Sequence, residues 1–185
     1  MRWAAFASLE TSRLRLRKLR REDVAHYYTR LASSEAVTRY MLFQPHKSME
    51  ESSASVEKWL ARYEPGTCYH WVIALKETDE LIGMIEPLRF DEQENSCSFA
   101  YMLGEDFWGK GYGTEALTAV LDFLFSKMEM LRVEADHMAG NPASGAVMGK
   151  AGMVCCGRDE KKYEKNGIVH DAVRYVITKE RWLTK

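Results

Sequence analysis

The sequence predicts a single α/β domain, spanning residues 1–185, on a central mixed sheet that is mostly antiparallel. Three observations support this fold class. Three apolar runs of strand length follow one another between residues 69 and 103, with short polar turns between them. An amphipathic helix, a strand and a short capped helix come next, and a last strand lies near residue 170. A meander followed by this alternation predicts about six or seven strands with about four flanking helices.

The first predicted elements are a strand and two helices. Arg13 to Leu19 alternates charged and apolar side chains, as a half-buried strand does. Apolar residues spaced i, i+3, i+4 and i+7 recur from Val24 to Leu31 and from Val56 to Tyr63, which predicts two amphipathic helices. Their aromatic side chains are expected in the core, and a substrate pocket between the helices is the alternative.

The predicted meander consists of Tyr69–Leu75, Leu81–Leu88 and Cys97–Leu103. A stripe of apolar residues then predicts a helix from Thr114 to about Lys127. Leu131–His137 alternates again and is a predicted strand. Asn141 followed by Pro142 predicts the start of a short helix, with Asn as the N-cap and Pro in the first turn. Val169–Thr178 is the last predicted strand.

The composition excludes several classes of protein. With 46% hydrophobic and 29% charged residues the chain is globular, and a net charge of −1 argues against nucleic acid as a partner. No apolar run reaches the roughly 18 residues of a membrane-spanning helix, so we expect no membrane partner. Four irregularly spaced cysteines predict a reduced, cytoplasmic protein without a metal site. The short apolar stretch Met1–Leu9 runs into charged residues, so we interpret it as mature sequence.

The strongest chemical signal is the segment Phe107–Ala116, FWGKGYGTEA. Gly109, Gly111 and Gly113 alternate there between a predicted strand and a predicted helix. Glycine permits positive φ and lets an anion approach the main chain, and the free N–H groups of the first helical turn point at that anion. The turn is therefore a candidate site for a phosphate or a diphosphate.

Two known phosphate-binding patterns are met only in part. The segment from Gly104 matches most of a P-loop, but Gly111 stands where that motif needs the hydroxyl that holds Mg²⁺, and we reject it. Gly111, Gly113 and Ala116 fit the dinucleotide pattern GxGxxA, with Glu134 near the place of its ribose-binding acid. A three-stranded meander precedes the turn, however, where a dinucleotide-binding domain has its first βα unit. A nicotinamide dehydrogenase is therefore kept as an alternative.

The order of strand, glycine-rich turn, long helix, strand and Asn-capped helix resembles the acetyl-CoA-binding half of the GNAT superfamily of N-acetyltransferases. The family motif Gln/Arg-x-x-Gly-x-Gly/Ala matches Trp108–Gly113, WGKGYG, with Trp in place of Gln or Arg. Four segments resemble the Rim-type branch, which contains the ribosomal-protein N-terminal acetyltransferases. They are the turn WGKGYGTEA, the later NPAS, the N-terminal SLETSRLRLRKLRREDV and the C-terminal HDAVRYVIT. The resemblance covers the chain from about Leu9 to Thr178.

The resemblance implies a GNAT-like fold with one splayed pair of strands, and direct transfer of acetyl from acetyl-CoA to a primary amine. The amine would be a protein N-terminal α-amine or that of a small molecule, and the protein a monomer or homodimer. Met102 and Leu103 would pair with the pantetheine arm through their main chain. Asn141 would contact that arm, and Ser144 would lie near the sulfur. The diphosphate would be held by the main chain of Gly109, Lys110, Gly111, Tyr112, Gly113 and Thr114.

The acid and the base are where this chain departs from the family pattern. Met148 stands where many relatives have Tyr, and Ser98 and Gly149 stand where Glu is common. We expect Glu86, an acid within an apolar strand, to supply the catalytic carboxylate, and Ser144 to act as general acid. Because the same losses would also mark a non-catalytic acyl-CoA-binding or sensor protein, that function is the alternative.

The choice of acceptor is expected to depend on the two N-terminal helices, the Phe43–Lys47 loop and the final hairpin. The near-neutral net charge gives no indication of which amine is used. Candidates for the lining of an acceptor pocket, with core packing as the alternative, are Tyr27, Tyr28, Tyr40 and Trp71.

Overall fold

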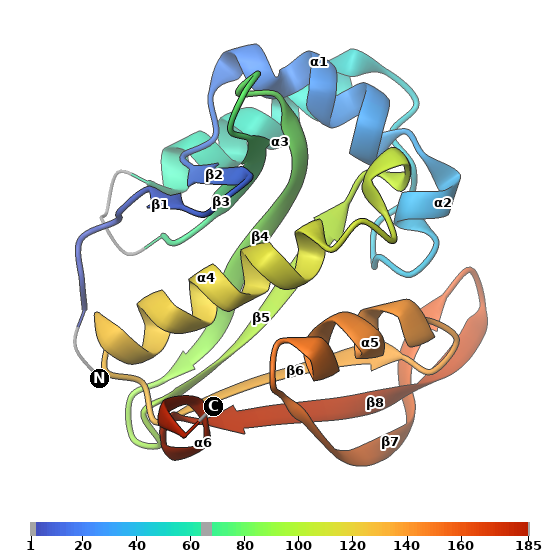
Figure 1. Ribbon diagram of the computed structural model, residues 1–185. Helices are drawn as coiled ribbons and strands as arrows, with labels where there is room; N and C mark the ends of the chain where they lie inside the picture. Colours follow the sequence, from blue (N-terminus) through green and yellow to red (C-terminus); the bar gives the residue numbers. More distant parts are fainter. Residues whose placement is uncertain (1–2, 64–67, 185) are drawn as a thin grey trace.

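An eight-stranded sheet organises residues 3–63 and 68–184, the part of the chain that the computed structural model describes (Figure 1). Neighbouring strands are antiparallel except β5 and β6, which are parallel. The mixed, mostly antiparallel sheet predicted from the sequence is confirmed, with eight strands in place of six or seven. From one edge to the other the strands are β1 (Leu9–Glu10), β2 (Leu14–Arg17), β3 (Trp71–Leu75), β4 (Leu81–Asp91), β5 (Ser96–Leu103), β6 (Arg132–Met138), β8 (Ile168–Thr178) and β7 (Val154–Lys165).

Two strands are absent from the sequence prediction. β1 is only two residues long. β7 is an edge strand beside β8, and most of its side chains are exposed. Its segment EKKYEK therefore lacks the alternation of polar and apolar residues by which a half-buried strand is recognised.

The four predicted helices are present in the predicted order, with one change of type. Among the described residues, three further short helical segments, Glu35–Thr38, Glu105–Phe107 and Lys179–Leu183, were not predicted. The helix predicted from Val24 is a 3-10 turn, one turn of α-helix and a π-helical turn in succession. Apolar spacing does not distinguish these windings, because each brings residues three to five apart onto one face. The helical segments are η1 (Arg21–Asp23), α1 (Val24–Tyr27), η2 (Tyr28–Ala32), α2 (Glu35–Thr38), α3 (Met49–Arg62), η3 (Glu105–Phe107), α4 (Tyr112–Ser126), α5 (Pro142–Lys150) and α6 (Lys179–Leu183).

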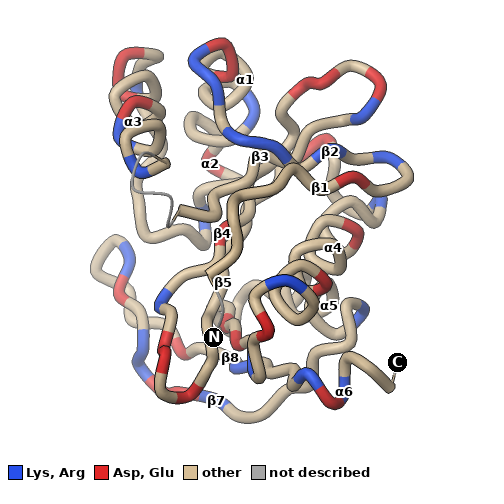
Figure 2. Tube along the Cα trace, turned by 90° about the vertical axis from the view of Figure 1, so that its left-hand side faces the viewer, with Lys and Arg blue, Asp and Glu red and all other residues tan. Residues whose placement is uncertain are grey.

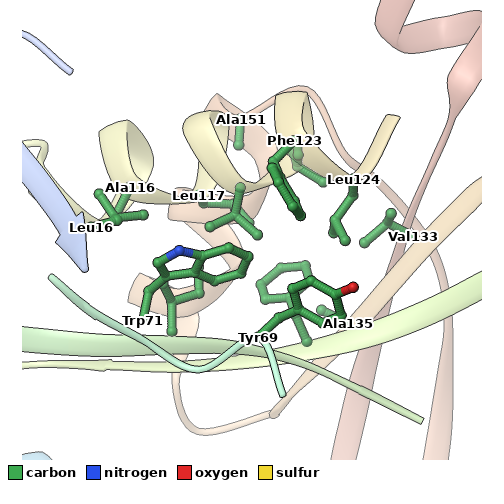
Figure 3. Close-up of a cluster of buried hydrophobic side chains, with 14 of the residues drawn as sticks. Leu16, Tyr69, Trp71, Ala116, Leu117, Phe123, Leu124, Val133, Ala135 and Ala151 are labelled. Carbon is green, nitrogen blue, oxygen red and sulfur yellow. The ribbon is translucent and has the colours of Figure 1, made fainter. Parts of the chain in front are cut away.

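A hydrophobic core lies on each face of the sheet. On one face α4 covers the strands, and Figure 3 shows its Leu117 and Phe123 pointing toward Trp71 of β3. On the other face α1 and α3 cover the strands, and Val56 of α3 is buried in the same cluster as Met84 of β4. These two layers fix the face of the sheet on which each side chain of β4 and β5 lies.

β5 and β6 separate after a short paired stretch. The register joins Ser96–Ser98 to Arg132–Glu134, and Figure 1 shows the two strands diverging beyond it. Among the described strands, the remainder of β5, Phe99–Leu103, has a partner only in β4. The chain leaves this free edge through η3 and the glycine-rich turn and enters α4. The splayed strand pair implied by the family resemblance is therefore present.

Charged residues of both signs are interspersed along the chain, as the colours of Figure 2 show, in keeping with the net charge of −1. Within residues 3–63 and 68–184, none of the helices is long and apolar enough to cross a membrane. The same ranges contain no group of three or more His, Cys, Asp or Glu side chains arranged to hold a metal ion.

Candidate active site

The glycine-rich turn leads into a helix N-terminus with free N–H groups. Gly109 and Gly111 have φ angles of +71° and +83°, in the left-handed region that favours glycine. Gly111 is the N-cap of α4, and no side chain caps this helix. The N–H groups of Tyr112, Gly113 and Thr114, in the first turn, consequently have no partner within the helix. Together with the helix dipole they form a binding site for an anion.

The main chain at the end of β5 is directed toward the side on which β6 diverges. Leu103 lies opposite Gly83, and the N–H of Gly104 donates to the main-chain oxygen of Ile82 at 2.8 Å. In an antiparallel ladder this pattern makes Leu103 a non-hydrogen-bonded residue. Its N–H and C=O groups, and those of Tyr101 two residues earlier, therefore point away from β4.

One of the two residues expected to pair with a pantetheine arm lacks the required orientation. Successive residues of a strand direct their N–H and C=O groups to alternate sides, so those of Met102 point at β4. The structure therefore corrects the expectation that the main chain of Met102 pairs with the arm. The peptide groups of Tyr101, by contrast, have the orientation that such pairing requires. The indole Nε1 of Trp108 donates to the Leu103 oxygen at 2.7 Å, so this oxygen already has a partner. The Leu103 N–H and both main-chain groups of Tyr101 also point away from β4, and a ligand could pair with them.

Two hydroxyl groups meet beside this edge. The Oγ of Ser144, in the first turn of α5, lies 2.9 Å from the phenol oxygen of Tyr101. Asn141 caps α5, as predicted, by accepting from the Ser144 N–H at 3.4 Å. A Cβ on Gly113 would lie 3.5 Å from Val147 of α5 and 4.0 Å from the Tyr101 ring. The glycine-rich turn, the end of β5 and the first turns of α5 therefore adjoin one another.

The phenol of Tyr101 is a proton donor at neutral pH. Burial raises its pKa to about 12, and the hydrogen bond with Ser144 opposes this rise only in part. Because the phenol stays protonated, it can donate to Ser144 Oγ and leave the serine hydrogen free for another acceptor. Tyr101 was not predicted as a site residue, because an aromatic residue in an apolar strand ordinarily packs in the core.

Glu86 lies on the opposite face of the sheet from Ser144. It follows Met84 by two residues, and Met84 packs in the cluster under α1 and α3. The Glu86 carboxylate accepts a hydrogen bond from Arg62 Nη2 at 3.1 Å. Burial raises the pKa of this carboxyl, and the Arg62 guanidinium counteracts the rise only in part. The two predicted catalytic residues are thus not brought together, and each adjoins its own face of β4 and β5.

None of the three residues that replace the family's Tyr and Glu supplies a proton donor of its own at the glycine-rich turn. Met148 is fully buried in the core beneath α5. Ser98 Oγ donates to the main-chain oxygen of Leu88 at 3.3 Å and is therefore turned toward β4. Gly149 has no atom within 4 Å of the position of a Cβ. The hydroxyl pair of Tyr101 and Ser144, by contrast, lies beside the free end of β5.

Two of the three segments expected to select the acceptor, the loop after α2 and the final hairpin, contact each other. Lys165, at the end of β7, donates from Nζ to three main-chain oxygens of the segment from the end of α2 into the following loop, at 2.5–2.8 Å. Gln44 Nε2 of the same loop lies 2.5 Å from Asn166 Oδ1 of the β7–β8 hairpin. The loop and the hairpin are therefore held together by hydrogen bonds and form one continuous surface, called the wall below. The residues whose oxygens accept from Lys165 are Thr38, Met41 and Phe43.

The aromatic pocket candidates divide into two pairs. Tyr27 and Trp71 are buried in the two cores, so core packing accounts for both. Tyr40 lies against Gly140, where a Cβ would be 3.4 Å from the tyrosine ring, at the turn between β6 and α5. The Tyr28 phenol donates to a main-chain oxygen of the loop before α3 at 3.4 Å. Tyr28 and Tyr40 therefore stay candidates for an acceptor pocket.

Comparison with known families decides between an acetyltransferase fold and a nicotinamide dehydrogenase. A family model described as an acetyltransferase (GNAT) domain matches residues 13–154. The chain belongs to the GNAT acetyltransferase family. This match includes the meander, the glycine-rich turn and the Asn-capped helix, so the nicotinamide dehydrogenase alternative is wrong.

Proteins similar to this GNAT chain include a ribosomal-protein enzyme, by sequence, and a polyamine enzyme, by fold. It is 31% identical over 164 residues to an uncharacterized N-acetyltransferase, p20, of Bacillus licheniformis, covering 89% of this chain and 86% of that protein. It is 25% identical over 182 residues to the ribosomal protein uS5 alanine N-acetyltransferase of Escherichia coli, covering 94% and 85%. Spermidine N-acetyltransferase from Vibrio cholerae, solved with CoA and spermine, has a TM-score of 0.79 at 21% identity, covering 94% and 99%. The resemblance to the Rim-type branch is thus confirmed.

Proposed function

We propose that this GNAT protein transfers the acetyl group of acetyl-CoA to a primary amine. The observation that carries the proposal is the meeting of three features: the free N–H groups at the start of α4, the unpaired end of β5 and the hydroxyl pair of Ser144 and Tyr101. An extended ligand with an anionic group and a reactive sulfur would use all three. Acetyl-CoA is such a ligand, and the spermidine N-acetyltransferase of the same fold was solved with CoA.

The residues at the site fit acetyl-CoA. The main-chain N–H groups between Gly109 and Thr114 would hold the diphosphate, and Lys110 would add a positive charge. The main chain of Tyr101 and Leu103 would pair with the pantetheine arm as an added strand does. Asn141 uses its side-chain oxygen to cap α5, so its NH₂ group would contact the arm. When bound, acetyl-CoA supplies the thioester that the amine attacks.

Acetyl transfer to an amine needs a base for the amine and an acid for the departing thiolate. Glu86 would accept a proton on the face covered by α1 and α3, where burial raises its pKa and makes it a stronger base. The Ser144 hydroxyl, hydrogen-bonded to Tyr101, would give a proton on the face covered by α4 and α5. Because Glu86 and Ser144 lie on opposite faces of the sheet, the proton would leave the amine on one side of β5 and reach the thiolate on the other. The Leu103 N–H would stabilise negative charge on the thioester oxygen.

The proposed acceptor class is a primary amine, either the N-terminal α-amine of a protein or a small-molecule amine. The names of two relatives, one acting on uS5 alanine and one on spermidine, support both kinds. Tyr28 and Tyr40, beside the wall formed by the loop after α2 and the β7–β8 hairpin, are the proposed lining of the acceptor pocket. We expect the enzyme to be a monomer or a homodimer.

The test is the release of free thiol from acetyl-CoA in the presence of a panel of primary amines. The panel contains peptides with N-terminal alanine or serine, polyamines, amino acids and aminoglycosides. Saturable thiol release that requires both protein and amine supports acetyl transfer. CoA binding by calorimetry with no thiol release for any amine would instead support the non-catalytic acyl-CoA-binding alternative.

Replacing Ser144 by alanine is expected to lower kcat about 100-fold and to leave the Kd for CoA unchanged, because the hydroxyl acts on the departing sulfur and not on the diphosphate. Steady-state kinetics and calorimetry measure the two quantities. Ser98→Ala is the matched control, since the Ser98 hydroxyl faces β4. Equal kcat values for Ser144→Ala and the unsubstituted enzyme would contradict the role of Ser144.

The pH profile of kcat/KM is expected to depend on Glu86. The base must be ionised, so kcat/KM rises with pH through the raised pKa of this carboxyl. Arg62 lowers that pKa, so Arg62→Met should move the acidic limb to higher pH, whereas Glu86→Gln should remove the limb and cost about 100-fold in kcat/KM. Arg21→Met, which breaks an exposed pair with Glu57, is the control. A limb that is unmoved in both Arg62→Met and Glu86→Gln would exclude Glu86 as the base.

A further inference from the structure

A guanidinium from the N-terminal part of the chain lies against the glycine-rich turn. Arg13, directly before β2, donates from Nη1 to the main-chain oxygen of Lys110 at 3.0 Å, across a sequence separation of 97 residues. Its Nη2 lies 3.4 Å from the position that a Cβ on Gly111 would take. Its Cζ lies 4.4 Å from the centre of the Tyr112 ring, at cation–π distance. Arg13 therefore contacts Lys110 and Tyr112 of the turn and lies beside Gly111.

Glu115 holds this guanidinium in place. The Glu115 carboxylate accepts from Arg13 Nε at 2.7 Å and from Nη2 at 2.6 Å. Its other oxygen accepts from the Arg13 N–H at 2.9 Å, from Thr11 Oγ1 at 2.5 Å and from Ser12 Oγ at 3.1 Å. Burial opposes ionisation of Glu115, but the bonds from Thr11 and Arg13 outweigh it and lower the pKa of the carboxyl. The carboxylate is thus ionised at neutral pH, and its Oε2 holds two nitrogens of the guanidinium beside the first turn of α4.

The contact between Arg13 and Lys110 orients one peptide plane of the turn. The C=O and the following N–H of a trans peptide point in opposite directions. Because the Lys110 oxygen points at Arg13, the N–H of Gly111 points away from Arg13. No cis peptide bond is present in the described residues. Arg13 therefore turns a carbonyl oxygen, which would repel an anion, to the outside of the turn.

The effect of Arg13 on an anion comes through geometry more than through charge. Glu115 carries a negative charge at salt-bridge distance from Arg13, so the two charges nearly cancel in their effect on an anion bound at the turn. Lysine would keep the positive charge but could not form the planar fork that bonds Glu115 through two nitrogens and Lys110 through a third. The identity of the side chain, and not only its charge, is therefore expected to matter.

We propose that Arg13 is a positioning residue of the coenzyme site, which aligns the Lys110–Gly111 peptide so that the turn binds the diphosphate of CoA. This role rests on the proposed use of acetyl-CoA. It assigns to the segment directly before β2 a part in a site that the sequence motif alone places between residues 107 and 116. Arg13 touches the turn and not the ligand, so its effect should be confined to coenzyme affinity.

The experiment is calorimetric titration of the full chain with CoA, for the unsubstituted protein, Arg13→Met, Arg13→Lys and Arg15→Met. Arg15 is the matched control, because it lies two residues further along the chain, its side chain is 37% exposed against 46% for Arg13, and it pairs with Glu10 and Asp79 away from the turn. Both Arg13 variants are expected to bind CoA about tenfold more weakly, the loss of roughly one charge-assisted hydrogen bond's contribution. Arg15→Met is expected to bind CoA as the unsubstituted protein does.

The outcomes separate this role from the proposed function. Ligand-free thermal unfolding of each variant identifies any loss of folded protein, and Arg13→Lys serves if Arg13→Met does not fold. Full rescue by lysine would overturn the geometric role in favour of a charge effect, and unchanged affinity in Arg13→Met would overturn any role of Arg13. If the unsubstituted protein bound no CoA, the proposed function would fail, and the role of Arg13 with it.

Discussion

Replacing Gly111 by valine is expected to weaken CoA binding by about 30-fold or more. Gly111 has φ of +83°, a conformation that costs an L-residue about 1–2 kcal/mol and a β-branched residue more. In the free variant, residue 111 can relax out of the left-handed region. Binding of the diphosphate then requires that region again, so the strain energy reduces the free energy of binding. Since 1.4 kcal/mol is a factor of ten in affinity, about 2 kcal/mol gives the predicted loss. Calorimetric titration with CoA measures it.

A second reason for this loss is the direction of the new side chain. A Cβ at Gly111 would lie 3.4 Å from Arg13 Nη2, so valine would press against the guanidinium that orients the turn. Gly109→Ala is the matched control, because Gly109 shares the positive φ but has no atom within 4 Å of a Cβ. We expect about a fivefold loss there, from strain alone. Normal CoA affinity in Gly111→Val would show that the turn is not the diphosphate site.

Replacing Trp71 by alanine is expected to lower the free energy of unfolding by about 3–5 kcal/mol. Trp71 is fully buried between β3 and α4, packs against Phe6 and Phe123, and donates from Nε1 to the Ala7 main-chain oxygen at 2.8 Å. Truncation leaves a cavity and an unpaired oxygen together. For a domain of this size the melting temperature should fall by roughly 6–20 °C. Thermal unfolding followed by circular dichroism measures this shift.

Trp3→Ala is the control for Trp71→Ala. Trp3 is 44% exposed and stacks on Tyr69 at the edge of the same cluster. Its removal should lower the free energy of unfolding by about 1 kcal/mol or less, as for other exposed side chains. Equal stability losses in the two variants would contradict the assignment of Trp71 to the centre of the core.

The spacing of apolar residues predicted those helices and strands that bury a face against a hydrophobic core. β3, β4, β5, α4 and β6 all appear within a few residues of their expected bounds, because each has a continuous apolar face against one of the two cores. β7 was not predicted, since an exposed edge strand needs no apolar face. The helix after Arg21 was predicted as one regular helix, and its three windings share the same apolar spacing.

Local motifs predicted the parts of the site that are contiguous in the chain. The positive φ of Gly109 and Gly111 and the cap by Asn141 follow from short segments. Arg13 and Tyr101 were missed, because their contacts join residues 97 and 43 positions apart. The error at Met102 has a different cause: the alternation of side chains along a strand does not indicate which neighbour each peptide group faces, and that depends on the pairing register with β4.

The most direct test is a crystal structure of the protein with CoA. We expect the diphosphate oxygens within hydrogen-bond distance of the main-chain N–H groups between Gly111 and Thr114. We expect the pantetheine arm alongside the main chain of Tyr101 and Leu103, with the sulfur near Ser144 Oγ. A CoA molecule bound on another face, with its diphosphate away from the start of α4, would contradict the account.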